Sequence, residues 1–257
     1  MRGSTMNYLS LALAAMLFGI LPANANILLT FFPGSDFNSN TAAMDATLGI
    51  TGYQIDGFES TTLLPGLTIS LSGGVPSTTW TSLPALFDGD TFSSFTQNQS
   101  WDGTHEAGNA TGNLPNSTTT PSNIANLITF NYAAGALSFG IGLSNFQSLN
   151  TSGGFAVTNH DLVVNGVNLG VLETLAAGAW SPGLTRNAYV RIDATGGSTI
   201  TSVGFESINQ PPSEQDFLMF DHLAINATSA VPEPSLQWPL GLACVMLMLL
   251  WRYRRAT

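Results

Sequence analysis

The chain contains no lysine among its 257 residues, and its six basic residues are all arginine. Four of these arginines lie near the ends of the chain, so residues 26–235 carry all 16 acidic groups against only Arg186 and Arg191. Nucleic-acid binding depends on basic side chains that contact phosphates. We therefore expect no nucleic-acid partner, and the acidic excess favours divalent cations or neutral partners such as glycans.

Cysteine is almost absent, since Cys244 is the single cysteine of the chain. Residues 26–235 therefore contain none, and no disulfide can stabilise them even in an oxidising compartment. These residues, about 210 in number, are enough to bury the core of one sizeable domain. The sequence predicts a single domain that is stabilised by core burial alone.

The N-terminal segment is typical of a signal peptide. An apolar stretch over residues 9–21 follows Arg2, and Ala23 and Ala25 supply small side chains at the two positions that signal peptidase reads. We expect residues 1–25 to be removed, with cleavage after Ala25.

The C-terminal segment predicts a membrane anchor. Residues 236–251 are apolar apart from Gln237, and as a helix they would be about 24 Å long, slightly less than a usual span. Arg252, Arg254 and Arg255 follow, and basic residues favour the cytoplasmic side. We expect a linker at 226–235, a transmembrane helix at 236–251 and a cytoplasmic tail at 252–257.

The linker contains the sequence Val231-Pro232-Glu233-Pro234-Ser235. Together with the signal peptide, the apolar segment and the arginine cluster, this motif resembles the PEP-CTERM sorting-signal proteins of Gram-negative bacteria. The resemblance covers residues 231–255 and the N-terminal signal. It implies processing by an exosortase near Pro232-Glu233-Pro234, and transfer to the cell surface or to the extracellular matrix of a biofilm that contains exopolysaccharide.

Residues 26–225 show a periodicity of two rather than 3.6. Apolar side chains alternate with small or polar ones over 67–71 and 137–143, and the ranges 200–205 and 217–225 are also typical of strands. In the range 161–172, Asn165-Gly166 lies between two apolar runs, which predicts a β-hairpin with a type I′ turn. No amphipathic helix is expected. These patterns predict an all-β domain, an antiparallel β-sandwich or jelly roll.

Residues 97–123 are mainly polar, and we expect a long surface loop there. Within it, Trp101 has small or polar neighbours and is the candidate for stacking on a sugar ring.

Asp88, Asp90 and Asp102 are candidate calcium ligands, although aspartates in such turns more often bond the local backbone. Asp221 shares strand parity with Leu223 and Ile225, which predicts either a polar edge or buried hydrogen bonds.

Catalytic motifs are missing or incomplete. His105-Glu106 opens like a zinc-protease motif, but Asn109 stands where the second histidine is required. His105, His160 and His222 are expected to make ordinary polar contacts. The sequence therefore predicts a non-catalytic surface or matrix protein without a required cofactor, either structural or associated with exopolysaccharide.

Two alternatives remain open at the level of sequence. A secreted glycan hydrolase, or a calcium-dependent carbohydrate-binding module, would bring carboxylates together in one cleft. The candidates are Asp88, Asp90, Asp102, Glu106, Asp216 and Asp221. A purely structural protein would instead self-associate through the edges of its sheets.

Overall fold

The computed structural model describes residues 26–33, 41–84, 86–88, 101–102, 105–112, 122–144, 159–176, 188–208 and 218–227. The signal peptide at 1–25, the sorting motif at 231–235, the apolar segment at 236–251 and the tail at 252–257 lie outside these residues. Within the described ranges, no helix has the length and apolar character needed to cross a membrane.

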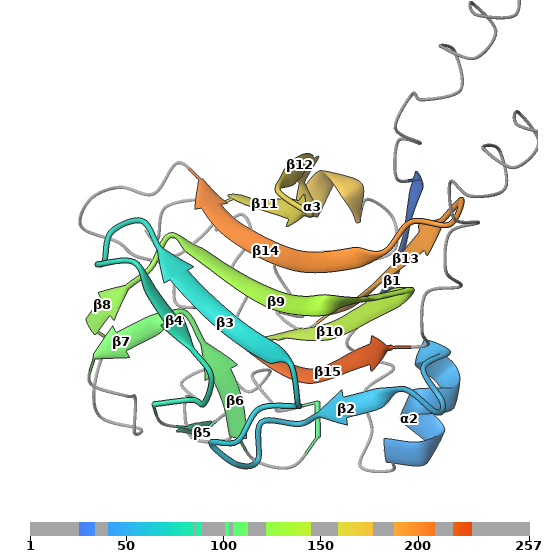
Figure 1. Cartoon of the computed structure of the whole chain (residues 1–257), viewed down its shortest axis with the longest axis horizontal. Coiled ribbons are helices and arrows are strands. Elements are labelled where there is room, and N and C mark those ends of the chain that lie inside the picture. The colour runs from blue at the N-terminus through green and yellow to red at the C-terminus, as the bar shows by residue number, and fades with distance from the viewer. Residues whose placement is uncertain are drawn as a thin grey trace, which may run out of the picture.

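Two antiparallel sheets form the body, as Figure 1 shows, and the expectation of an all-β, sandwich-like fold is confirmed. One sheet has the order β1 (Asn26–Pro33), β13 (Ala188–Thr195), β10 (Ser138–Ser144), β15 (Met219–Asn226), β6 (His105–Gly108) and β5 (Phe87–Asp88), and β2 (Gln54–Asp56) also pairs with β15. The other has the order β12 (Val167–Val171), β11 (Asn159–Val164), β14 (Ile200–Ile208), β9 (Leu127–Ala136), β3 (Leu67–Ser72) and β4 (Thr78–Trp80). A small separate sheet pairs β7 (Ala110–Gly112) with β8 (Ser122–Ile124).

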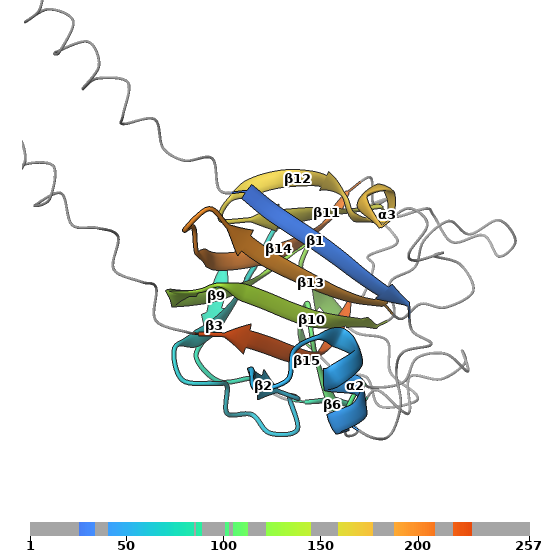
Figure 2. The same cartoon turned by 90° about the vertical axis from the view of Figure 1, so that its right-hand side faces the viewer.

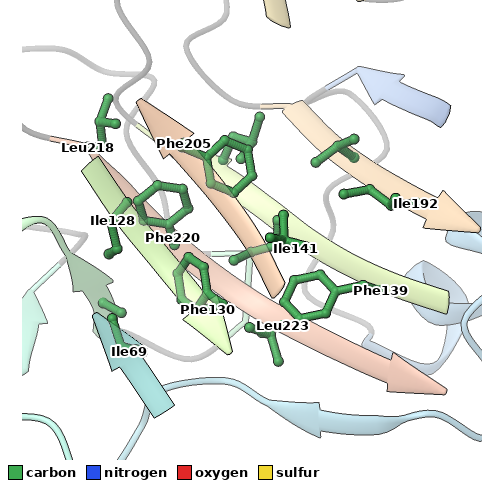
Figure 3. Close-up of a cluster of buried hydrophobic side chains, with 14 of the residues drawn as sticks. Ile69, Ile128, Phe130, Phe139, Ile141, Ile192, Phe205, Leu218, Phe220 and Leu223 are labelled. Atoms are coloured by element: carbon green, nitrogen blue, oxygen red, sulfur yellow. The ribbon is translucent and has the colours of Figure 1, made fainter. Parts of the chain in front are cut away.

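The main hydrophobic core lies between the two sheets (Figure 3). Aromatic rings from both sheets meet there, with the ring centroid of Phe220 on β15 5.1 Å from that of Phe130 and 5.0 Å from that of Phe205. On β10, the alternation predicted from the sequence places Phe139, Ile141 and Leu143 in this core. Burial of each such side chain contributes about 1.5–3 kcal/mol to the free energy of unfolding.

The predicted hairpin is confirmed. Strands β11 and β12 pair with Val164 opposite Val167, so the loop consists of Asn165 and Gly166 alone. Both have positive φ, 52° and 75°, as a type I′ turn requires. The Asn165 side chain also accepts a hydrogen bond from the Thr201 amide at 2.7 Å, which links the turn to β14.

Two short helices accompany the strands, and one expectation about a non-strand segment is wrong. A helix, α2 (Thr41–Leu48), packs on the outer face of the seven-stranded sheet, and its eight residues are too few to show a helical periodicity. A second helix, α3 (Leu172–Leu175), is a single turn after β12. The range 97–123, expected to be a surface loop, contains β6 and β7, where the small side chains of Ala107 and Ala110 are buried.

The first and last described strands reach the same end of the sandwich. Leu28 on β1 pairs with Asp193, which pairs with Ser138, which pairs with Asn226 on β15. Three strand spacings separate Leu28 from Asn226, or about 14 Å. Figure 2 shows these four strands side by side. We call this the terminal end, and we call the opposite end, where β13 begins at Ala188 and β14 finishes, the far end.

Candidate functional site: a carboxylate–histidine cluster on the outer face of the sheet

A β-bulge in β15 creates the site. Gly140 on β10 pairs with Ala224, but Gly142 pairs with Asp221, so β15 contains an extra residue between these pairs. His222 has a φ of 48°, an unusual value for a residue other than glycine. The bulge shifts the parity, so that Leu223 and Ile225 enter the core while Asp221 bonds a segment outside it. The shared parity predicted for Asp221, Leu223 and Ile225 is therefore wrong.

The bulge also lies where the partner of β15 changes. β6 pairs with Met219 and Phe220, while β2 pairs with the stretch from Leu223 to Ile225. Asp221 and His222 therefore lie between the ends of two partner strands. Their polar groups find partners in α2 and in the segment that holds Trp101 and Asp102.

The imidazole of His222 lies between two carboxylates. Its Nε2 is 2.8 Å from Oδ1 of Asp45 on α2, and its Nδ1 contacts Oδ2 of Asp102. A carboxylate only accepts hydrogen bonds, so two such contacts are fully satisfied by an imidazolium ring that donates from both nitrogens. The His222 side chain is 2 % exposed, whereas the side chain of Asp45 is 23 % exposed and that of Asp102 is 13 % exposed. The His222 ring therefore bridges α2, the sheet and the segment at 101–102.

Asp221 accepts hydrogen bonds from the backbone of two residues of this bridge, Asp102 and His222. Its Oδ2 accepts the Asp102 amide at 2.8 Å, and its Oδ1 accepts the His222 amide at 2.6 Å. The side chain is fully buried. Burial raises the pKa of this carboxyl well above its usual value, and the negative charges of Asp102 and Glu106 add to the effect, while the two amide hydrogen bonds oppose it. Asp221 thus holds a proton more readily than an exposed aspartate.

Trp101 does not form a sugar-binding surface, and its expected exposure is wrong. The side chain is fully buried, its Nε1 donates to the Leu143 carbonyl at 3.4 Å, and its ring packs edge-on against Tyr189 with centroids 5.5 Å apart. Gly142 makes room for it, since a Cβ there would be 2.3 Å from Trp101 Cδ1. Alternate glycines on β10 carried this signal, because glycine in a strand often marks a close approach.

A second, smaller hydrophobic core surrounds the cluster. It consists of Met44, Leu48, Ile50, Trp101, Tyr189 and Ala224. Tyr189 donates its hydroxyl to the His222 carbonyl at 3.1 Å, and burial raises the pKa of this phenol well above its usual value. The site is therefore closed on the outside by apolar side chains.

Arg191 fixes the C-terminal end of α2. Its Nη1 donates to the Leu48 carbonyl at 2.7 Å, and its Nε lies 3.0 Å from Oδ2 of Asp193. Asp193 in turn accepts the Ser138 hydroxyl at 2.5 Å. A guanidinium at the end of a helix binds carbonyls that have no partner within the helix. Hence α2 is attached to the sheet at both Asp45 and Leu48.

Of the three predicted calcium ligands, Asp102 alone has a side chain with a described placement. Asp102 contacts His222. The backbone of Asp88 on β5 pairs with that of His105 on β6, and Asp90 lies outside the described residues. Among the residues with a described placement, no group of three or more His, Cys, Asp or Glu side chains is arranged to hold a metal.

The carboxylates that a hydrolase would need converge only in part. Asp221 interacts electrostatically with Asp102 and Glu106, but Asp221 and Glu106 are fully buried rather than exposed in a cleft. Asp216 lies outside the described residues. A substrate cannot reach Asp221 in this arrangement, because the side chain is fully buried. Its two carboxyl oxygens accept hydrogen bonds from two backbone amides.

Sequence reasoning missed Asp45, Tyr189 and the central role of His222. Asp45 and His222 are 177 positions apart, and neither stands in a local motif. No protein-family model matches the chain, and neither curated proteins nor solved structures give a significant match.

Proposed function

We propose that this chain is an exported protein of the cell surface or extracellular matrix, sorted by its C-terminal signal and processed by signal peptidase and an exosortase. One structural observation supports the proposal. β1 begins at Asn26, the residue after the predicted signal cleavage, and β15 ends at Asn226, five residues before the sorting motif at Val231. Cleavage at both predicted positions would leave every strand of the two sheets intact.

The position of the terminal strands also suits a membrane-held precursor. Asn26 and Asn226 lie at the terminal end of the same sheet, so a C-terminal transmembrane helix would hold the body by that end. The far end would then point away from the membrane. The acidic surface repels anionic lipid head groups, which favours a body that stands clear of the bilayer.

Within this proposal the His222 cluster is a structural device rather than a catalytic one. Both ring nitrogens of His222 and both oxygens of Asp221 are bonded inside the fold, and both side chains are buried. The body is a pair of antiparallel sheets in a sandwich-like arrangement, which suits a structural or glycan-associated role. Exopolysaccharide is the partner that its acidic, cysteine-free surface and its proposed location favour.

The partner is tested by co-sedimentation of the processed protein with the exopolysaccharide of the producing bacterium. The acidic protein should sediment with the glycan at both low and high salt, because binding to a neutral polymer does not depend on ion pairing. A matched chain with His105→Asn, which changes an exposed pair with Glu59, serves as control. Absence of co-sedimentation at every salt concentration would leave only the structural role.

A further inference from the structure

The seven-stranded sheet ends at β1, and no other strand that the structure describes pairs with the outer side of this strand. Its eight residues pair with β13 without a register shift. The other edge strands are protected, since β2, β4 and β5 have only two or three residues and β12 has a shifted register with β11. Native edge strands are usually short, bulged or charged, because an open edge can pair with another chain. β1 is long and regular, and it contains no charged residue.

The backbone amides of β1 point alternately toward β13 and toward the open edge. Ala194 on β13 donates its amide to the Leu137 carbonyl, just before β10, so its neighbour Asp193 is directed at β1. Asp193 pairs with Leu28, and these two residues therefore form a hydrogen-bonded pair. The alternation leaves the amides of Ile27, Leu29 and Phe31 directed at the open edge. Pro33 has the same parity, so its missing N–H removes no bond between β1 and β13.

Apolar side chains along this edge are incompletely covered. Among the described residues, the exposed large hydrophobic side chains are those of Leu28 on β1, Val167 on β12 and Leu175 in α3. Figure 2 shows β1 and β12 along the same edge of the sandwich, and α3 directly follows β12. The inward-facing side chains of β1 pack against the main core but stay partly exposed: Ile27, Leu29 and Phe31. The core is therefore not fully covered along β1.

Charge favours a second copy of the chain as the partner of this edge. β1 and β12 contain no charged residue, whereas residues 26–235 carry 16 acidic groups against two arginines. Like charges repel, so two copies approach most easily through the part of the surface that carries fewest of them. A basic partner would instead be attracted to the acidic faces. An uncharged strand with amides directed outward is therefore best matched by an identical strand.

We propose that β1 pairs antiparallel with β1 of a second copy and joins the two seven-stranded sheets into one continuous sheet. A twofold axis perpendicular to the sheet relates the copies and keeps the inward side chains of both on the same face. With Leu29 opposite Leu29 of the partner copy, Ile27 lies opposite Phe31 of the partner copy. Every amide of β1 that is directed at the open edge then donates to a carbonyl of the other strand. The apolar side chains of the two cores become neighbours across the axis.

The pairing goes beyond the proposed sorting and does not require it, but the proposed function adds a consequence. Antiparallel pairing turns the terminal ends of the two bodies in opposite directions, because β1 begins at that end. Two precursors that both stand upright on one membrane by their terminal ends cannot pair in this way. This step rests on the proposed function: dimers form after the exosortase releases the body, and the released protein assembles in the matrix.

The test measures the mass of the full chain, purified in detergent, by light scattering over a range of protein concentrations. Because it is made in solution, the measurement does not depend on sorting. The mass should rise from that of a monomer to that of a dimer. Leu28→Lys should raise the dissociation constant by about 10- to 100-fold, because it removes an apolar contact and places a like charge on each copy near the axis. Thr79→Lys is the matched control, since it adds the same charge to an exposed position of β4 and should leave the dissociation constant unchanged.

Amide hydrogen exchange, followed by NMR in the wild-type chain, identifies the contact even if a variant fails to fold. The amides of Ile27, Leu29 and Phe31 should exchange rapidly in the monomer and slow down as the dimer forms. Those of Leu28 and Phe32 should be protected at every concentration, because they bond β13. A chain that stays monomeric at its highest soluble concentration, or a dimer in which the first three amides still exchange rapidly, would overturn the proposal.

Discussion

His222 and Asp45 lie 177 positions apart in the chain, and their side chains meet with Nε2 and Oδ1 2.8 Å apart. This contact joins the bulge of β15 to α2. It is possible because the bulge turns His222 out of the main core, and because Arg191 fixes the other end of the helix. The side chain of His222 thus links α2 to the outer face of the seven-stranded sheet.

Replacing His222 should be strongly destabilising. His222→Asn retains a residue that tolerates positive φ but removes the ring that bonds both Asp45 and Asp102. We expect a loss of about 3–5 kcal/mol in the free energy of unfolding, because carboxylates are left buried without a counter-charge. Urea denaturation measures it. The control is His105→Asn, whose pair with Glu59 is largely exposed, and it should cost less than about 1 kcal/mol. Equal losses in both variants would contradict the account.

Gly142→Ala tests the close packing of Trp101 against β10. The added Cβ would lie 2.3 Å from Cδ1 of the indole, so the ring must move, and overpacking of this kind costs about 1–3 kcal/mol. Gly204→Ala is the control, because its Cβ would meet the Thr129 hydroxyl at 3.1 Å. Thermal unfolding should show a clearly larger loss for Gly142→Ala. If Gly142→Ala is as stable as the wild type, Trp101 is not packed as described.

Asp221 should make stability depend on pH. Its pKa is raised by burial above the usual 3.8, so above that pH the folded protein retains a proton that the unfolded chain releases. Proton uptake is then greater in the folded state, and the free energy of unfolding falls as the pH rises from 3.8 through the raised pKa. Asp221→Asn removes this contribution, so its stability should fall less steeply over the same pH range. Parallel stability curves for the two proteins would refute the assignment.

Arg191→Lys should loosen α2 without disrupting the sheets. Lysine keeps the charge but cannot bond Asp193 and the Leu48 carbonyl at the same time with a planar fork. We expect faster hydrogen exchange of the amides over residues 45–50, with β9 and β14 unchanged. Unaltered exchange in that range would show that the helix is held by other contacts.

Much of the fold could be predicted from local sequence, because a two-residue period and a turn such as Asn165-Gly166 depend only on neighbouring side chains. The site could not. Alternation cannot locate a bulge, and the bulge at His222 reverses the parity on which the interpretation of Asp221 rested. Trp101 was placed on the surface because its neighbours are polar, whereas its environment is set by Gly142 and Tyr189, which are distant in the chain.

The central claim is that the described body is delivered by two processing signals, and the masses of the protein's own termini test it most directly. The full chain should be produced in a Gram-negative host that contains an exosortase, in the same host without it, and as a Glu233→Ala variant. Intact-mass analysis should find a mature N-terminus at Asn26 in every case, and loss of the segment after the Pro232-Glu233-Pro234 element only for the wild-type chain with the exosortase present. A C-terminal apolar segment that stays attached in that host, or an N-terminus other than Asn26, would contradict the account.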